Sequence, residues 1–366
     1  MLKSRKKLAL LLLAGTSYLA SFSGMVQVLP QAQANTPTPQ VPTAPLSPTD
    51  SRAILDPALQ NVRELTAPQS TSSQARTISR TSNSAISYDL TTGKVQVGGS
   101  LPTTTARASS LISPPSPGSS TNVVAEPRTG VQSSTGGAKP RSVIGTDSRT
   151  KITSTSAYPW RTVTKLFVTF PKSNSPGGCS GTLIAAQYVL TAGHCVYDKA
   201  SGGFAKKIEV IPGLSGTYKP YGSAYSKKIR TYSAWTSSQN SNYDFALITL
   251  DRPIGNSTGW LGYTTYSSVN GITGNIAGYP GDKGGTYLYY HSGPISSSTS
   301  YRLYYQIDTY GGQSGSGIYY IDSQNNRYIF GIHTTGVTPS NPSYNSGTRI
   351  DAQKYNYITS SIASGT

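Results

Sequence analysis

Three short segments of the chain carry side chains suited to acid–base and nucleophilic chemistry. They are residues 191–195 (TAGHC), 242–248 (NYDFALI) and 311–317 (GGQSGSG), and they contain His194, Asp244 and Ser314. Each segment alone also fits a plain loop, turn or helix cap. In the order His, Asp, Ser, they supply a general base, a carboxylate that orients it and a nucleophile. The base is needed because a serine hydroxyl is a weak nucleophile at neutral pH.

The glycines before Ser314 suit a second task in the same chemistry. Because they lack side chains, Gly311 and Gly312 let the backbone come close to a reacting carbonyl group. The amides of Gly312 and Ser314 are therefore candidates for an oxyanion hole, in which each donor stabilises the transition state by about 2.7–4 kcal/mol. The chain order of the three residues is that of the chymotrypsin-like fold and differs from the orders of subtilisin and the α/β-hydrolases.

The elements that must position these residues have the composition of a β protein. Charged residues make up 12% of the chain and hydrophobic residues 36%, against roughly 25% and 45–50% in a typical soluble protein. Residues 142–366 hold 24 of the 26 tyrosines and both cysteines, and short strand-like runs alternate there with turns. The runs are 163–170, 182–191, 207–211, 227–232, 244–250, 272–277, 287–291, 301–307, 317–321 and 328–333. A weak helical pattern appears only at 353–363, so we expect an all-β domain that ends in a short helix.

The first 141 residues differ from this domain and indicate targeting and processing segments. A basic start, an apolar run over 8–20 and the site Ala32-Gln33-Ala34 predict a signal peptide over residues 1–34. Residues 35–141 are rich in Ser, Thr and Pro, so we expect a mostly disordered propeptide or spacer. Within it, only residues 86–97 look strand-like. Export would place the two cysteines in an oxidising compartment.

The three segments together resemble those of chymotrypsin-like serine proteases, and in more detail those of bacterial glutamyl endopeptidases. Further stretches are similar to the Bacillus members: 142–150 (SVIGTDSRT), 279–283 (YPGDK), 291–293 (HSG) and 308–316 (DTYGGQSGS). The resemblance covers 142–366 almost continuously and does not extend to 35–141. It implies two six-stranded antiparallel β-barrels with a short C-terminal helix. It also implies a serine endopeptidase that cleaves after glutamate, and less after aspartate, through an acyl-enzyme.

The resemblance implies roles for residues outside the three segments. A disulfide between Cys179 and Cys195 would brace the loop of the catalytic histidine, and a bridge over a loop of about 15 residues contributes roughly 3 kcal/mol to stability. His333 and Thr309 would lie in the pocket that binds the substrate glutamate. His291 also matches the family, and we expect it to have a structural role.

Gln313, the residue before the nucleophile, suggests a distinct use of the N-terminus formed by processing. Trypsin-like enzymes have an aspartate at this position, which captures their new N-terminus. In glutamyl endopeptidases the mature α-amino group reaches the pocket and pairs with the bound glutamate. Cleavage between Arg141 and Ser142 would create that amine, and Lys139-Pro140-Arg141 suits a separate, trypsin-like activating protease.

Two alternative functions stay open at this point. Asp308 lies six residues before Ser314, where trypsin-like enzymes keep the aspartate that binds lysine or arginine, so an endopeptidase specific for basic residues is the first. A non-catalytic, basic module that binds surfaces is the second. Residues 142–366 contain 18 Lys+Arg and 9 Asp+Glu, a net charge of +9, which would also suit acidic substrates.

No motif indicates a cofactor, a metal ion or nucleic-acid recognition. The three histidines are scattered, and two cysteines are too few for a four-cysteine zinc site. No apolar stretch is long enough for an internal membrane span. We therefore expect a secreted monomer that has no stable membrane association after signal removal. Its partners would be polypeptide substrates with glutamate before the scissile bond and the protease that cuts after Arg141.

Overall fold

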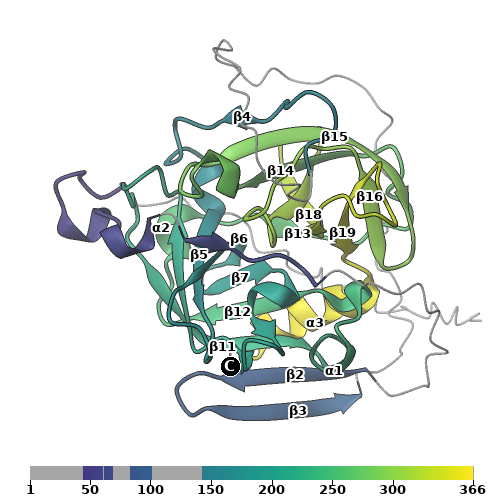
Figure 1. Ribbon diagram of the computed structural model, residues 1–366, viewed down its shortest axis with the longest axis horizontal. Helices are drawn as coiled ribbons and strands as arrows, with labels where there is room; N and C mark the ends of the chain where they lie inside the picture. Colours follow the sequence, from purple (N-terminus) through teal and green to yellow (C-terminus); the bar gives the residue numbers. More distant parts are fainter. Residues whose placement is uncertain (1–43, 61, 69–82, 101–141, 366) are drawn as a thin grey trace, which may run out of the picture. The chain divides into compact units, whose positions relative to one another are not determined.

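The computed structural model describes residues 44–60, 62–68, 83–100 and 142–365 (Figure 1). The predicted signal peptide, residues 1–34, and the predicted processing residue Arg141 lie outside these ranges. Within them, strands make up most of the regular structure, and they pair into two large sheets. Each of these sheets contains a closed barrel of six strands.

The first barrel is built from antiparallel strands rich in β-branched and aromatic residues. Its strands follow one another in the order β10, β5, β6, β7, β12 and β11, and a pairing between β10 and β11 closes the ring. Their bounds are β5 Val163–Thr169, β6 Gly177–Ala185, β7 Tyr188–Thr191, β10 Lys207–Pro212, β11 Ala224–Tyr232 and β12 Ala246–Leu250.

The second barrel has the same number of strands and the same kind of closure. Its order is β18, β17, β14, β15, β16 and β19, and a pairing between β18 and β19 completes it. The bounds are β14 Thr273–Gly278, β15 Tyr289–Ser298, β16 Arg302–Tyr305, β17 Gly317–Ile321, β18 Arg327–Thr335 and β19 Asn345–Arg349. Two short strands, β4 (Thr150–Lys151) and β13 (Gly262–Tyr263), add to its edges.

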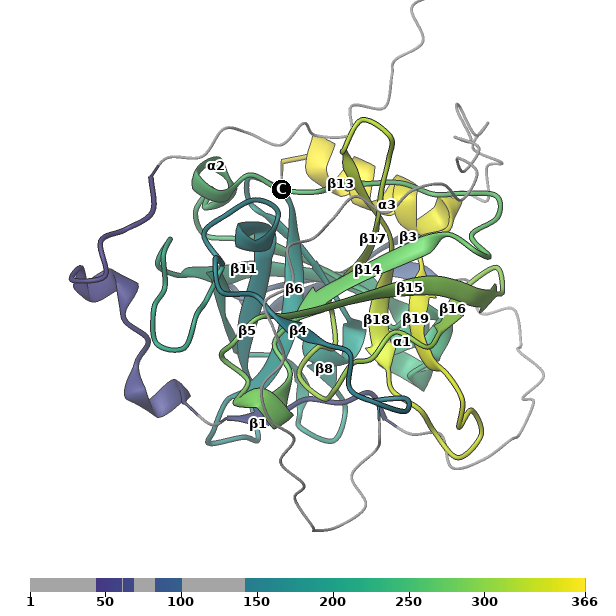
Figure 2. The ribbon, with the colours of Figure 1, turned by 90° about the horizontal axis from the view of Figure 1, so that it is seen from above.

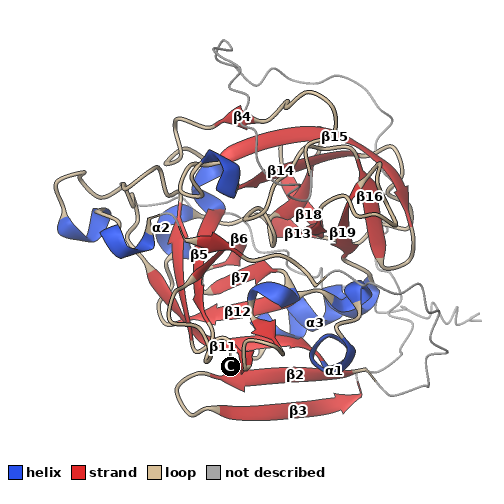
Figure 3. Cartoon of the chain, viewed as in Figure 1, coloured by secondary structure: helices blue, strands red, loops and turns tan. Residues whose placement is uncertain are grey.

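Helix α3 (Ala352–Ala363) follows β19 and packs against the first barrel (Figure 2). It begins at Asp351, whose side chain accepts a hydrogen bond from the Lys354 amide, as a helix N-cap should. Tyr357 and Ile358 enter the apolar cluster of that barrel. The remaining elements of residues 142–365 are short (Figure 3): η3 Trp160–Thr162, η4 Gly193–Cys195, β8 Tyr197–Asp198, β9 Gly203–Phe204, α1 Ser233–Ser238, η5 Ser241–Tyr243, α2 Gly255–Thr258 and η6 Gly281–Lys283.

Three apolar clusters fill the structure. One lies mainly in the first barrel and also includes Tyr319 of β17 and Ile332 of β18, and one, which includes Ile276 and Phe330, lies in the second barrel. A third joins Phe167 of β5 to Tyr279 and Leu288, which flank strands of the second barrel. Each side chain of this size stabilises the fold by about 1.5–3 kcal/mol when it is fully buried. The third cluster therefore holds the two barrels in a fixed relation, on which any site between them depends.

The predicted fold class is confirmed, with two differences in detail. The run 182–191 was predicted as one strand, and this is wrong, because a turn at Ala186 and Gln187 divides it into β6 and β7. Strand β19 was not predicted. Its sequence, Asn-Ser-Gly-Thr-Arg, has no apolar side chain, although all five residues are buried.

Parts of the predicted propeptide pack on the first barrel. The strand-like stretch 86–97 is a hairpin of β2 (Ser84–Asp89) and β3 (Lys94–Ser100), and β2 extends the sheet at β11. Upstream, two short 3-10 turns, η1 (Ser51–Ala53) and η2 (Pro57–Leu59), precede a two-residue strand, β1 (Arg63–Glu64), on β6. Residues 35–43, 61, 69–82 and 101–141 lie outside the described ranges. None of the helices within those ranges has the length and apolar composition needed to cross a membrane.

Candidate active site

His194 and Asp244 lie together because they follow and precede two paired strands. β7 ends at Thr191, β12 begins at Ala246, and these two residues are directly opposite in the ladder. His194 Nδ1 lies 2.9 Å from Asp244 Oδ2, and the His194 amide donates a hydrogen bond of 2.9 Å to Asp244 Oδ1. Both side chains are buried. Asp244 thus fixes the backbone and the ring of His194 at once, which is the role of an orienting carboxylate.

Ser314 comes from the second barrel, in the loop between β16 and β17, and this loop rests on β6 of the first. The Ser180 amide donates a hydrogen bond of 2.8 Å to Ser314 O, and Ser180 Oγ donates one of 2.8 Å to Gly312 O. Gly315 has a φ of 90°, and a Cβ on it would collide with Ser180 O and Thr191 Oγ1. This approach of the two barrels therefore requires glycine at 315.

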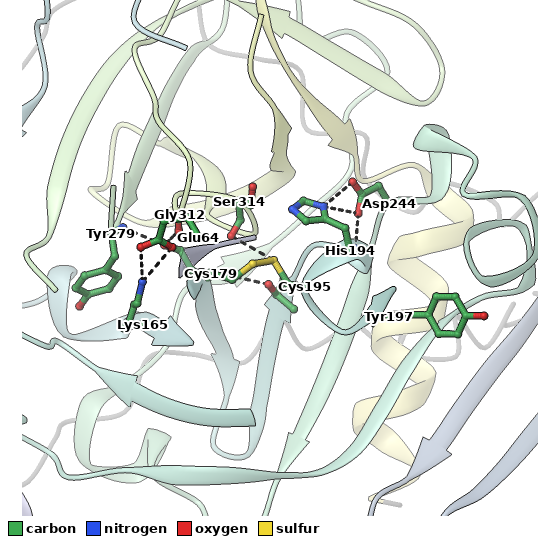
Figure 4. The surroundings of a disulfide bond; sticks show 12 residues. Glu64, Lys165, Cys179, His194, Cys195, Tyr197, Asp244, Tyr279, Gly312 and Ser314 are labelled. Atoms are coloured by element: carbon green, nitrogen blue, oxygen red, sulfur yellow. Dashed lines mark hydrogen bonds and ion pairs between the residues drawn. A yellow bond between two sulfur atoms is a disulfide. The ribbon is translucent and has the colours of Figure 1, made fainter. Parts of the chain in front are cut away.

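No hydrogen bond joins the side chain of Ser314 to His194 in the described structure. His194 Nε2 is buried and has no hydrogen-bond partner among the described residues. Both residues lie close to the disulfide in Figure 4, and Cys195 Sγ is 3.6 Å from Ser314 O. A buried nitrogen without a partner is unfavourable by about 1–3 kcal/mol. The ring is therefore poised to accept a proton from a hydroxyl that comes within reach.

The backbone beside Ser314 offers hydrogen-bond donors. Neither the Gly312 amide nor the Ser314 amide donates to any group in the described part of the chain. Gly312 has a φ of 98°, which orients its peptide as few other residues allow, and a Cβ there would lie 2.5 Å from Tyr279 O. Two free amides on one tight turn are the donors that a developing oxyanion needs.

A disulfide joins the loop of His194 to strand β6. Cys179 on β6 and Cys195 in η4 are bonded, with a Cα–Cα distance of 6.1 Å. These are the two cysteines that the resemblance pairs. Because Cys195 follows His194 directly, the bond holds the histidine loop against β6.

His333 lies on β18, is 2% exposed, and is held by one strong contact. Its Nδ1 is 2.7 Å from the Tyr305 hydroxyl. Burial raises the pKa of Tyr305, so the phenol stays protonated, and its hydroxyl shares this hydrogen bond with Nδ1. Burial, with help from nearby His194 and Arg302, lowers the pKa of His333 to about 3. The ring is therefore neutral near pH 7.

Thr309 and Ser142 lie together in the structure and are joined by a backbone hydrogen bond. The Thr309 amide donates to Ser142 O over 3.1 Å, and Asn345 Nδ2 donates to the same oxygen over 2.6 Å. Two buried atoms here, Thr309 Oγ1 and Asn345 Oδ1, lack a hydrogen-bond partner among the described residues. Ser142 is buried although the bond to Arg141 is intact. Ser142, the residue predicted to follow the processing site, is thus held beside Thr309.

Asp308 is occupied by the backbone of the segment that follows Ser142. Its Oδ1 accepts a hydrogen bond of 2.8 Å from the Ile144 amide, and its Oδ2 accepts one of 2.8 Å from the Ser148 amide. The Asp308 amide donates to His291 Nδ1 over 2.8 Å. Asp308 therefore anchors residues 144–148, and His291 contacts Asp308.

Several residues of this site carry no signal in the sequence. Tyr305 and Asn345 act through partners that lie 28 residues away for His333 and 203 residues away for Ser142, and no spacing rule connects them. The one cluster of possible metal ligands among the described residues is Cys179, His194 and Cys195. Its two sulfurs are bonded to each other and are not thiolates, so the cluster does not fit a metal ion.

Comparison with known proteins gives consistent matches. The sequence model described as Trypsin matches residues 152–358. A glutamyl endopeptidase of Bacillus licheniformis is 45% identical over 224 residues, which cover 60% of this chain and 68% of that protein. An extracellular metalloprotease of Bacillus subtilis is 39% identical over 222 residues, with 60% and 69% covered. A solved structure of a Glu endopeptidase in complex with MPD has a TM-score of 0.54 and 34% identity, and it covers 60% of this chain and 99% of that one.

The burial of His333 predicts a specific response to acid. The pKa of His333 is about 3 in the folded chain and 6.5 in the unfolded chain, so the unfolded chain binds the proton at a higher pH. The contribution of the neutral, buried His333 to the free energy of unfolding is complete above pH 6.5 and is lost as the pH falls towards 3. The imidazole resonances of a Ser314→Ala chain should show no titration of His333 near 6.5. His333→Gln identifies its signal among the three histidines, and a midpoint at the ordinary value would contradict the assignment.

Proposed function

The chain belongs to the trypsin family of serine proteases, and from this premise we propose that it cleaves peptide bonds after glutamate with His194, Asp244 and Ser314 as its triad. One observation carries the proposal: a buried His194–Asp244 pair with a free Nε2 stands beside a serine loop with two free amides. Each missing partner in this arrangement is an atom that a bound peptide and the serine hydroxyl would supply.

The reaction follows from these positions. Ser314 Oγ attacks the scissile carbonyl while His194 Nε2 takes the hydroxyl proton, and Asp244 stabilises the resulting imidazolium. The carbonyl oxygen becomes an oxyanion that accepts hydrogen bonds from the Gly312 and Ser314 amides. His194 then gives its proton to the departing amine, which leaves an ester on Ser314. A water molecule, deprotonated by His194, hydrolyses the ester and restores the enzyme.

Specificity for glutamate would come from three groups in the pocket. A neutral His333 donates from Nε2, Thr309 Oγ1 is buried and without a partner, and the freed amine of Ser142 supplies the positive charge. The neutral state of His333 makes that amine the main source of charge in the pocket. Asp308 supports this assignment rather than specificity for basic residues, because both of its oxygens are bonded to backbone amides.

We also propose the domain boundaries and the processing route: a signal peptide over 1–34, a propeptide over 35–141 and a secreted protease domain over 142–366. The docked position of Ser142 means that cleavage after Arg141 need not move residues 142–148. The cut would convert an amide nitrogen into an amine with a pKa of about 7.7–8.0, and so add a charge to a site already built.

Replacement of the nucleophile tests the triad. Ser314→Ala should lower kcat by at least about 10³-fold and leave the fold intact, because it removes the attacking oxygen. A serine-directed organophosphonate should label Ser314 in the parent and nothing in the variant. Ser323→Ala, in an exposed turn, is the matched control and should be fully active. Equal rates in Ser314→Ala and the parent would refute the triad.

A cleavage profile on a denatured proteome tests the pocket. Cuts should follow Glu strongly, Asp less, and Lys or Arg hardly at all. Thr309→Val removes one hydroxyl donor without a change of shape, and kcat/KM on Glu substrates should fall about tenfold. Thr273→Val, on the exposed end of β14, is the control. A profile dominated by Lys and Arg would overturn the assignment.

The role of the new N-terminus has its own test. Arg141→Gln should keep the chain inactive on Glu substrates when a trypsin-like protease is added, because no α-amine forms at Ser142. Acetylation of that amine in the processed enzyme should lower kcat/KM on Glu substrates, by about tenfold for each 1.4 kcal/mol of lost attraction. Labelling by a small serine-directed reagent should persist. Full activity in the acetylated enzyme would show that the charge is not used.

A further inference from the structure

The pro-region contributes a strand to the wall of the candidate active site. β1 pairs in parallel with Gly177 and Gly178 of β6, and the Leu65 amide donates a hydrogen bond of 2.8 Å to Gly178 O. The side chain of Glu64 turns from this strand into the protein and is 13% exposed. Figure 4 shows its carboxylate near Gly312, the residue whose amide is assigned to the oxyanion hole.

Inside, the Glu64 carboxylate meets a buried cation. Lys165 Nζ lies 3.2 Å from Glu64 Oε1 and 3.3 Å from Oε2, and the lysine side chain is 0% exposed. Glu64 is the one acidic residue that reaches Lys165 within the described ranges. Burial lowers the pKa of Lys165, and the glutamate opposes this effect. An ammonium group so far from water is costly without a carboxylate partner.

Four glycines shape the space around that carboxylate. A Cβ on Gly178, Gly281, Gly285 or Gly312 would collide with the Glu64 side chain. For Gly281 the collision would be with Cγ at 2.5 Å, and for Gly312 with Oε2 at 2.5 Å. These glycines come from β6, from η6 and the turn after it, and from the serine loop, which are distant in sequence. The cavity is thus shaped for a side chain that ends in a carboxylate.

The position of this cavity assigns it to one half of the substrate. The residue before the scissile bond belongs in the pocket of His333 and Thr309, in the second barrel. The departing amine must lie where His194 can protonate it. The disulfide from Cys179, next to Gly178, fixes β6 to the His194 loop. A substrate chain that leaves the site on the amine side therefore runs along β6.

We propose that Lys165 and the four glycines form a second subsite, which takes an acidic side chain on the amine side of the scissile bond, and that Glu64 occupies it in the precursor. The inference rests on the proposed peptidase function and adds to its substrate class: polypeptides with acidic residues on both sides of the cut. β1 pairs with β6 and so adds a strand to the sheet, as in β-augmentation. Glu64 enters the subsite from this added strand.

After cleavage at Arg141, only non-covalent contacts retain the pro-region. Within the described ranges they include the buried Leu55, the pairing of β1 with β6, the hairpin β2–β3 on β11 and the Glu64–Lys165 pair. When Glu64 leaves, the Lys165 ammonium has no acidic partner among the described residues. A substrate carboxylate restores the pair, which makes the subsite selective for acidic residues over neutral ones.

A peptide library tests the subsite in the enzyme that remains after the full chain has been cut at Arg141 and the pro-region has been removed. Each peptide has Glu before the scissile bond and either Glu or Gln at one of the first three positions after it. At one of these positions, kcat/KM should be about tenfold higher for Glu than for Gln. Lys165→Met should bring that ratio to about one. A ratio of one in the parent, or an unchanged ratio in Lys165→Met, would overturn the proposal.

Two further variants separate the subsite from other effects. Lys227→Met removes one exposed charge from β11 and should leave the ratio unchanged. Gly281→Ala fills the space occupied by Cγ of the acidic side chain without altering Lys165, and should also abolish the preference, which keeps the test valid if Lys165→Met does not fold. The same peptides with Lys or Arg before the scissile bond report the proposed function separately. Cleavage after basic residues would reject glutamate specificity and leave the Glu/Gln comparison readable.

The occupant is tested through retention of the pro-region. In nicked chains that carry Ser314→Ala, Glu64→Gln should raise the dissociation constant of the pro-region about tenfold, measured by size exclusion and fluorescence. Gln60→Glu, an exposed change four residues upstream, is the control and should have no effect. Equal retention in Glu64→Gln and its parent would show that the Glu64–Lys165 pair does not hold the pro-region.

Discussion

The arrangement of the whole site depends on the hydrogen bonds of one buried serine, Ser180 on β6. Its amide donates to Ser314 O, its hydroxyl donates to Gly312 O and accepts from the Tyr279 amide, and its carbonyl accepts from Thr191 Oγ1. One residue thus connects the serine loop, the strand before η6 and the strand that leads to His194. Because every polar group of Ser180 is paired, a shift of any partner leaves a buried group unsatisfied, and the two barrels keep a common register.

The sequence predicts the parts of this structure that have local chemistry. His194, Asp244 and Ser314 each lie in a short segment with a recognisable pattern, and most strands were placed by β-branched and aromatic runs. Asn345 and Lys165 have no such pattern, because their function lies in partners brought to them by barrel closure. β19 was missed for a related reason: its burial comes from β16 and β18 on either side, and not from apolar side chains of its own.

The precursor differs from the proposed enzyme in electrostatics more than in shape. Ser142, Ile144 and Ser148 already make the contacts with Thr309 and Asp308 that would hold a mature N-terminus. A neutral His333 fits this state, because a buried imidazolium without a carboxylate partner would be costly. The proposed cleavage at Arg141 would supply the charge last, after the geometry is complete, so that little reorganisation would oppose the binding of glutamate.

The two charged subsites follow the same physical rule on either side of the scissile bond. Each proposed subsite would hold a cation where water is scarce: the Ser142 amine in the pocket and the buried Lys165 on β5, next to β6. Such a cation is weakly compensated by the protein and gains most from a carboxylate in van der Waals reach, because attraction grows as the local dielectric falls. The net charge of +9 over residues 142–366 adds only a diffuse, salt-screened attraction. In the proposed enzyme, discrimination between Glu and Gln would therefore arise at these two buried contacts and not from the surface charge of the domain.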